Sequence, residues 1–213
     1  MKIVAISDTH EQHFSLKIPI CDLLIVAGDF TYKGDFFAIR DFLYSFVEHQ
    51  PATNIVIVPG NHELTLEKAT PHAQLIKDFC KTKAINYLID SGATINNMKV
   101  WGSPYTPWFH DWAFNVPRNT IQWHWDLIPD DTEILVLHGP PYGILDKTKE
   151  GTNVGCEALT NTINSRLKNL KVCIFGHIHE AHGSVKINNV SYYNVSICNR
   201  AYEPVNPVTV IDI

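Results

Sequence analysis

The most constraining feature of this sequence is a series of short runs rich in Val, Ile and Leu, each of which ends at a polar cluster. Runs of this length bounded by turn residues are typical of buried strands. Five such runs occur, at residues 3–6, 23–27, 55–58, 134–137 and 172–175. Helical patterns lie between them, at residues 36–49, 72–83, 120–127 and 157–170. The alternation of strand and helix predicts a layered α/β fold.

Two hairpins are expected in addition to these strands. One joins residues 93–96 to 99–101 through Asn96-Asn97, and the other joins residues 183–187 to 190–194 through Asn188-Asn189. Hairpins add antiparallel pairs, so we expect a mixed sheet. A chain of 213 residues that is 45% hydrophobic has room for one sizeable core, and we expect a single domain over residues 1–213.

Charge and cysteine content exclude several classes of protein. A formal net charge of -5 provides no basic field for a phosphate backbone, so a dedicated nucleic-acid-binding module is not expected. Five widely spaced cysteines without a C-x-x-C pair indicate neither a disulfide framework nor a zinc ribbon, and they favour a reducing compartment. No apolar run approaches the length of a membrane span. We therefore expect a cytoplasmic protein without membrane association.

Residues that can bind metals follow the ends of all five predicted strands. Ligands of open α/β sheets bind beyond the carboxyl ends of the strands, so these residues are expected to converge. Imidazole and carboxylate groups suit Zn, Mn and Fe, and seven ligands are too many for one catalytic ion. Two ions that share a carboxylate form a clamp for attack at phosphorus. The seven residues are Asp8, His10, Asp29, Asn61, His138, His177 and His179.

Each of these residues, taken alone, has a plainer interpretation. An Asp that follows a strand is commonly a turn or N-cap residue, and Gly60-Asn61 by itself is a turn signal. Five such coincidences in order, at five strand ends, are not explained by turn chemistry. The order therefore favours a two-metal phosphoesterase.

The ordered series D-x-H, G-D, G-N-H-E, H-G and G-H-x-H resembles the calcineurin-like metallophosphoesterase superfamily. Residues 101–109, 138–143 and 175–180 are similar to its metallophosphoesterase-domain-containing subgroup. The resemblance implies a mixed β-sheet sandwich flanked by helices. It also implies that Asp8, His10 and His179 hold a first metal, that Asn61, His138 and His177 hold a second, and that Asp29 bridges the two. His62 corresponds to the catalytic histidine of the family, which contacts substrate rather than metal.

The resemblance implies a phosphodiesterase that cleaves small phosphodiesters or cyclic nucleotides through a metal-bridging hydroxide. The expected cofactors are two divalent ions, Mn²⁺ in vitro, with Fe, Zn and Mg as alternatives. The expected partner is a small phosphoester or nucleotide. Two alternatives stay open: a phosphomonoesterase or nuclease of the same superfamily, and a nucleotide-binding or scaffold module of the same fold with weak turnover.

Several further residues have more than one interpretation. Trp108 and Phe109 lie in a long irregular stretch, residues 102–118, and either stack on a nucleobase or anchor the loop in the core; the resemblance favours the site. Glu63 either orients a neighbour or caps the following helix, and capping is the expected role. The histidines outside the motifs are expected to be surface or satisfied core residues: His13, His49, His72, His110, His124 and His182.

Overall fold

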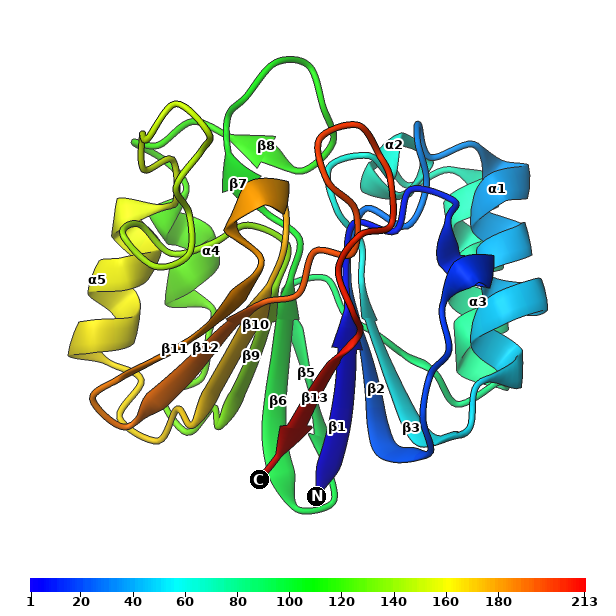
Figure 1. The fold of residues 1–213 in the computed structure, drawn as a ribbon, viewed down its shortest axis with the longest axis horizontal. Coiled ribbons are helices and arrows are strands. Elements are labelled where there is room, and N and C mark those ends of the chain that lie inside the picture. Colours follow the sequence, from blue (N-terminus) through cyan, green and yellow to red (C-terminus); the bar gives the residue numbers. More distant parts are fainter.

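The computed structural model describes residues 1–213 and contains two large β-sheets that lie face to face, with helices on both outer surfaces, and a third sheet of two short strands (Figure 1). The first sheet has the strand order β13-β1-β2-β3-β4. Its strands are β1 (Lys2–Ile6), β2 (Cys21–Ala27), β3 (Ala52–Val58), β4 (Asn86–Tyr87) and β13 (Thr209–Asp212). Strands β1 to β4 pair in parallel, and β13 adds to β1 in the antiparallel direction.

The second sheet has the strand order β11-β12-β10-β9-β6-β5. Its strands are β5 (Ser91–Ile95), β6 (Met98–Ser103), β9 (Ile134–Leu137), β10 (Val172–Phe175), β11 (Gly183–Ile187) and β12 (Val190–Asn194). The inner pairs are parallel, and the antiparallel pairs β5/β6 and β11/β12 are the two predicted hairpins. The predicted mixed sheet sandwich flanked by helices is confirmed.

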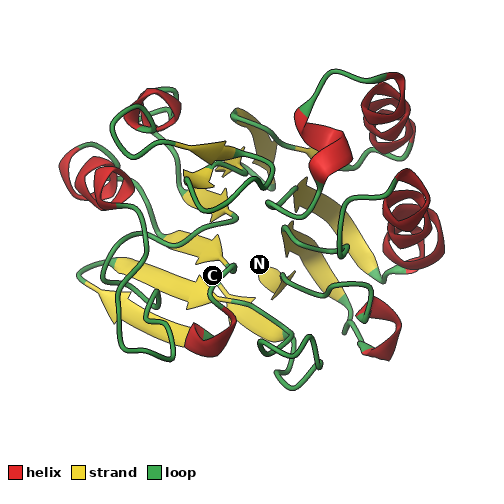
Figure 2. Cartoon of the chain, turned by 90° about the horizontal axis from the view of Figure 1, so that it is seen from above, coloured by secondary structure: helices red, strands yellow, loops and turns green.

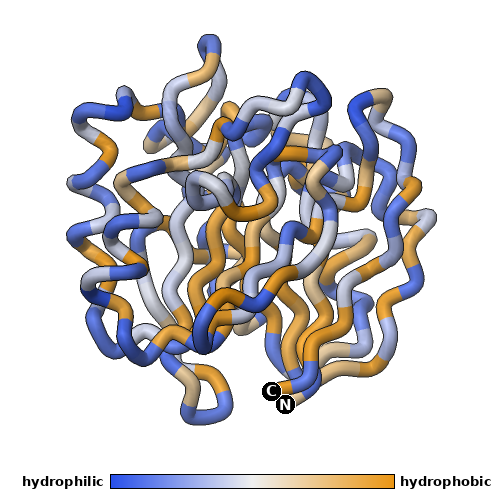
Figure 3. Tube along the Cα trace, turned by 60° about the vertical axis from the view of Figure 1, so that its left-hand side comes forward, coloured by the Kyte–Doolittle hydropathy of each residue, from blue (hydrophilic) through white to orange (hydrophobic).

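Side-chain alternation along the strands separates the core into layers. Ile3 and Ala5 of β1 face the second sheet, whereas Val4 and Ile6 face the helices on the other side. Strands that are buried on both faces read as continuous apolar runs, which explains the five runs in the sequence. Figure 2 shows the helices outside the two sheets, and Figure 3 shows the hydrophobic residues concentrated along the strands.

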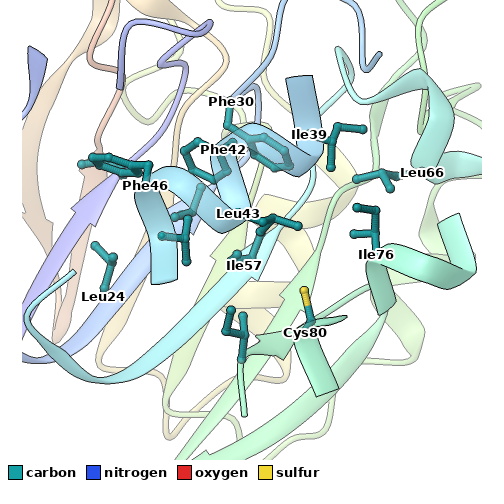
Figure 4. Packing of buried hydrophobic residues seen from close by; sticks show 14 of the residues in the cluster. Leu24, Phe30, Ile39, Phe42, Leu43, Phe46, Ile57, Leu66, Ile76 and Cys80 are labelled. Atoms are coloured by element: carbon teal, nitrogen blue, oxygen red, sulfur yellow. The ribbon is translucent and has the colours of Figure 1, made fainter. Parts of the chain in front are cut away.

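Helices α1 (Phe36–Asp41), α2 (Leu64–Glu67) and α3 (Pro71–Thr82) lie beside the first sheet, and α4 (Gln122–Asp126) and α5 (Glu157–Ser165) beside the second. The single helix expected over residues 36–49 is wrong in detail. After α1 the chain makes a π-helical turn over Phe42–Phe46 and a 3₁₀ turn over Val47–His49. The wider turn places the Phe42 and Phe46 rings in the core, where Phe42 stacks on Phe30 and Phe46 lies on its other side (Figure 4). Aromatic packing here outweighs regular helical hydrogen bonding.

His13, on the 3₁₀ turn His13–Ser15, is a buried polar residue whose side chain makes no hydrogen bond. It is 2% exposed, and neither ring nitrogen has a hydrogen-bond partner. Its ring packs against Phe42 and Phe46 with centroids 5.0 and 5.2 Å apart. The expectation of a surface or satisfied core histidine is therefore wrong at this position.

The topology determines where a site can form. The parallel strands β1, β2 and β3 of one sheet and β9 and β10 of the other all end at the upper edge of the sandwich in Figure 1. The loops that leave these five ends therefore meet above the interface between the sheets. None of the helices is long and apolar enough to cross a membrane.

Candidate metal centre

The loops at this edge bring all seven predicted ligands together. Three overlapping groups have ligand atoms within 4.8 Å of one another. The groups are Asp8, His10 and His179; His10, Asp29 and His62; and Asp29, His138 and His177. The first contains the three residues of the first implied set, and the third contains His138 and His177 of the second set together with Asp29. Because Asp29 belongs to a group with His10 and also to the group with His138, it lies between the two clusters.

The first cluster consists of Asp8, His10 and His179. His10 Nε2 lies 3.2 Å from His179 Nε2, which lies 3.4 Å from Asp8 Oδ1. The outer nitrogens are fixed by backbone carbonyls: His10 Nδ1 donates to Thr31 O at 3.1 Å and His179 Nδ1 donates to Asn199 O at 3.0 Å. These bonds place a proton on each Nδ1 and leave both Nε2 atoms directed at the centre, as is usual for histidines that bind metals.

The second cluster is centred on His138. Its Nε2 lies 2.8 Å from Asn61 Oδ1, 3.2 Å from Asp29 Oδ2 and 3.2 Å from His177 Nδ1. Its Nδ1 donates to Ala27 O at 3.0 Å, which orients the ring in the same way as in the first cluster. Four potential metal-ligand atoms therefore lie close together: two imidazole nitrogens, one amide oxygen and one carboxylate oxygen.

The two carboxylates are oriented by hydrogen bonds on their outer sides. Asp8 Oδ2 accepts from Ser7 Oγ at 2.5 Å, from Ser196 Oγ at 2.7 Å and from the His177 backbone N–H at 3.0 Å. Asp29 Oδ1 accepts from the His62 backbone N–H at 2.8 Å. These bonds leave Asp8 Oδ1 and Asp29 Oδ2 directed at the imidazoles.

The backbone of several candidate ligands is strained. Asp8, His10, Asp29 and His177 have φ values of 51°, 39°, 52° and 69°, in the left-handed region that residues other than glycine rarely adopt. Such conformations cost about 1–3 kcal/mol each and cluster at functional sites. Close approach adds a second constraint, because a Cβ at Gly60 would overlap Asp29 Oδ1. The loops therefore adopt unfavourable conformations that direct their side chains inward.

Burial and mutual charge set the protonation of the carboxylates and of two histidines. Burial alone would raise the pKa of Asp8 and of Asp29, but His179 beside Asp8 and His138 beside Asp29 hold each carboxyl pKa below its usual range. Burial likewise opposes charge on the two histidines, yet the facing carboxylates raise the pKa of His138 and of His179 to about 9. In the metal-free protein the clusters are therefore held together by ion pairs.

The other two histidines remain neutral at pH 7. Burial lowers the pKa of His10 to about 4 and that of His177 to about 3. Carboxylates, neutral imidazoles and an amide oxygen are suitable ligands for Zn, Mn and Fe, and a metal ion would replace the protons on the remaining rings. In each cluster a protonated imidazole faces a neutral one at 3.2 Å, His179 beside His10 and His138 beside His177, and a bound cation would take the place of the shared proton. The residues present thus fit divalent metals.

His62 lies beside these clusters with its own set of contacts. Its Nδ1 donates to Tyr32 O at 2.6 Å, and its Nε2 is 3.8 Å from Asp29 Oδ2. The Trp112 ring stacks on the imidazole, with centroids 4.2 Å apart and planes 20° apart. His62 is only 8% exposed, and its Nε2 faces the centre.

Glu63 does not cap helix α2, so that expectation is wrong. It stands at the N-cap position without a side-chain capping bond. Its fully buried carboxylate instead accepts from the N–H groups of Gly60, Asp29 and Thr31 at 2.7, 2.9 and 3.0 Å, and from Thr31 Oγ1 at 2.9 Å. Burial, and then the charge of Asp29, raise the pKa of Glu63 to about 7. One side chain therefore ties the loop after β2 to the loop after β3.

The aromatic residues near the site differ from those singled out in the sequence. Trp108 and Phe109 are 61% and 57% exposed, which contradicts the core-packing alternative. Rings that contact site histidines are those of Trp112, on His62, of Tyr202, whose centroid is 4.4 Å from that of His10, and of Tyr32, which stacks on His10 at 5.9 Å. The aromatic composition of residues 102–118 pointed to the loop of Trp112 but not to the residue. No sequence signal indicated Tyr202.

A mixed α/β sandwich with two clusters of Asp and His at its strand ends is the arrangement of metallophosphoesterases. The calcineurin-like phosphoesterase family model matches residues 1–181, and the chain belongs to this family. It is a family of hydrolases, and the clusters described above are its expected metal-binding feature.

Comparisons with individual proteins agree with this family. The chain is 36% identical to human Metallophosphoesterase domain-containing protein 1, over 100% of this chain and 71% of that protein. It is 33% identical to the Caenorhabditis elegans UPF0046 protein K07C11.7, over 94% of this chain and 71% of that protein. A solved structure of a putative 5'-nucleotidase from Staphylococcus aureus superposes with a TM-score of 0.53 at 14% identity, over 91% of this chain and 48% of the other. The last similarity concerns the fold alone.

Proposed function

We propose that this chain is a phosphodiesterase that hydrolyses small phosphodiesters, cyclic nucleotides among them, with two divalent metal ions. The observation that carries the proposal is the position of Asp29, which shares one group with His10 and another with His138 and His177. A carboxylate between two clusters is the arrangement that a dinuclear phosphoesterase requires. Residues from both sheets build the site, so we propose that residues 1–213 act as one domain.

The proposed ligands follow from the two clusters. Asp8, His10 and His179 would hold one ion, Asn61, His138 and His177 the other, and Asp29 would contact both. Mn²⁺ is the ion proposed for assays in vitro, with Fe, Zn and Mg as alternatives. When bound, such ions lower the pKa of water and neutralise the charge that develops on phosphate oxygens.

His62 is the proposed proton donor. As water attacks phosphorus and the bond from phosphorus to the leaving oxygen breaks, the leaving oxygen needs a proton, which His62 Nε2 would supply. Its Nδ1–H is committed to Tyr32 O, so Nε2 is the nitrogen that faces the centre. Asp29 Oδ2 lies 3.8 Å from this nitrogen.

A phosphodiester is proposed over a monoester because three sequence stretches resemble the metallophosphoesterase-domain-containing subgroup, and this resemblance implies diester cleavage. Trp108 and Phe109, exposed on the loop that also carries Trp112, are proposed contacts for a base or aryl group. The five free, buried cysteines support a reducing, cytoplasmic location.

The test compares bis(p-nitrophenyl) phosphate with p-nitrophenyl phosphate, using metal-free protein supplied in turn with Mn²⁺, Fe²⁺, Zn²⁺ and Mg²⁺. We expect metal-dependent hydrolysis that is faster for the diester, followed by turnover of 2′,3′- or 3′,5′-cyclic nucleotides. Asp29→Asn should abolish activity with every metal. The matched control is Asp131→Asn, which removes an exposed carboxylate and should leave activity unchanged.

Two of the alternatives, the phosphomonoesterase and the binding module, have their own outcomes in this experiment. Faster hydrolysis of the monoester would identify a phosphomonoesterase. Nucleotide binding by calorimetry without turnover at any metal would identify a binding module. Either result would refute the proposed phosphodiesterase.

A further inference from the structure

The proton donor proposed above is covered by an aromatic ring that no motif includes. Trp112 stacks on His62 with a centroid separation of 4.2 Å and an interplanar angle of 20°. Three other contacts hold His62: the bond from Nδ1 to Tyr32 O, the bond from its backbone N–H to Asp29 Oδ1, and the contact of its ring with that of His10, with centroids 4.7 Å apart and planes 72° apart. The Nδ1 bond directs one edge of the ring. The indole lies flat against a face of the imidazole and adds a further restraint on rotation about the Cβ–Cγ bond.

The loop of Trp112 is itself held in place. It connects β7 (Thr106–Pro107) to β8 (Asn115–Val116), two short parallel strands that form a separate small sheet. Asn115 Nδ2 donates to the Trp112 carbonyl at 3.1 Å, and the Ala113 N–H donates to Asn61 O at 3.0 Å. The second bond ties the loop directly to the residue that precedes His62. Trp112 is therefore placed on His62 by the backbone and not by chance contact of a mobile side chain.

We propose that Trp112 is a positioning residue that holds the His62 imidazole with Nε2 directed at the leaving oxygen. The inference rests on the proposed role of His62 in phosphodiester hydrolysis. Proton transfer requires the donor nitrogen within about 2.6–3.2 Å of the accepting oxygen. A displacement of about 1 Å at a reacting group can cost on the order of 10²-fold in rate. A ring free to rotate about its Cβ–Cγ bond would often miss this geometry.

The first test compares Trp112→Leu with Trp112→Phe. The Leu variant lacks a flat ring, so its kcat for the diester should fall by about tenfold or more, with little change in KM. The Phe variant keeps a stacking face and should recover most of the loss. The matched control is Trp123→Leu, which removes a 64% exposed tryptophan from α4 and should keep wild-type kcat.

A second readout does not depend on activity. In the metal-free protein, a stacked indole shields the ring protons of His62, so the His62 Hε1 resonance should move downfield in Trp112→Leu and stay near its wild-type position in Trp123→Leu. An unchanged Hε1 shift in Trp112→Leu would show that the rings do not stack in solution, and the proposal would be overturned.

The decisive measurement is a double-mutant cycle with His62→Ala. If Trp112 acts through His62, adding Trp112→Leu to His62→Ala should cause no further loss of kcat. The same fold-loss in both backgrounds would mean that Trp112 acts independently, for example by supporting the loop, and would refute the positioning role. A wild-type protein that fails to hydrolyse the diester at any metal would instead refute the proposed function, and the role of Trp112 with it.

Discussion

Replacing Glu63 with Gln tests whether the loops of the site depend on one buried carboxylate. Glu63 Oε2 accepts from the N–H groups of Asp29 and Gly60, and Oε1 accepts from the N–H and hydroxyl of Thr31. A glutamine retains one acceptor oxygen, and its NH₂ group must replace the other. If the amide oxygen takes the place of Oε2, the Thr31 hydroxyl can turn to accept from the NH₂ group, but the Thr31 N–H loses its acceptor.

The magnitude follows from these contacts. One orphaned buried N–H costs about 1–3 kcal/mol, and the two retained bonds lose the strength that an ionised acceptor gives them. Relief from burying a charge offsets part of this loss, because burial raises the pKa of Glu63 to about 7 and so disfavours the carboxylate. We expect a net loss of about 2–4 kcal/mol, or about 5–15 °C in Tm for a chain of this size.

Urea unfolding in EDTA, followed by circular dichroism, measures the effect without any contribution from metal. Glu67→Gln is the matched control, because Glu67 accepts a single bond, from the Phe114 N–H at 2.8 Å, which an amide oxygen can also accept. It should change stability by less than about 0.5 kcal/mol. A Glu63→Gln variant as stable as this control would show that the loops are held by other contacts, and the reasoning would fail.

Three further predictions concern metal and pH. Removing metal with EDTA should lower Tm by about 10–20 °C relative to protein at 100 times the dissociation constant, because each of the two ions, if it binds only the folded state, then adds about 2.7 kcal/mol; an unchanged Tm in calorimetry would contradict a metal site. His177→Gly should lower bound metal, measured by mass spectrometry, from about two ions toward one while the fold survives; two tightly bound ions in the variant would exclude His177 as a ligand. Burial lowers the pKa of His13 to about 4, so the folded state resists a proton that the unfolded chain takes up below about pH 6.5. The free energy of unfolding therefore decreases as pH falls from about 6.5 toward 4. The variant His13→Leu should reduce this decrease between pH 7 and 5 by up to about 2 kcal/mol in urea unfolding. Equal slopes of unfolding free energy against pH for both proteins would rule this out.

The layers of the fold were predictable because strand burial leaves a local pattern. The five apolar runs identify the central strands of both sheets, and Asn96-Asn97 and Asn188-Asn189 mark hairpin turns where left-handed backbone is needed. Helix continuity was not predictable in the same way. Residues 42–46 read as ordinary helix, but the packing of Phe42 and Phe46 favours a wider turn.

The approach of the candidate ligands to one another was predictable for a topological reason. Carboxyl ends of parallel strands lie at the same edge of a sheet, so a polar residue after each apolar run is directed to a common place, whatever the loops do in detail. This explains why Asp8, Asp29 and His138 meet although they are far apart in the chain. The residue types at these ends also determined the chemistry of the donor set.

Only the tertiary structure decided which residues hold the candidate metal ligands in place. Glu63 could cap a helix or tie two loops, and its role became clear only when the N–H groups of Asp29 and Thr31 were seen to lie within reach. Trp112 contacts His62 because the Ala113 N–H bonds to Asn61 O across the gap between two loops. Such contacts depend on how segments distant in sequence pack together, and side-chain periodicity within one segment carries no information about them.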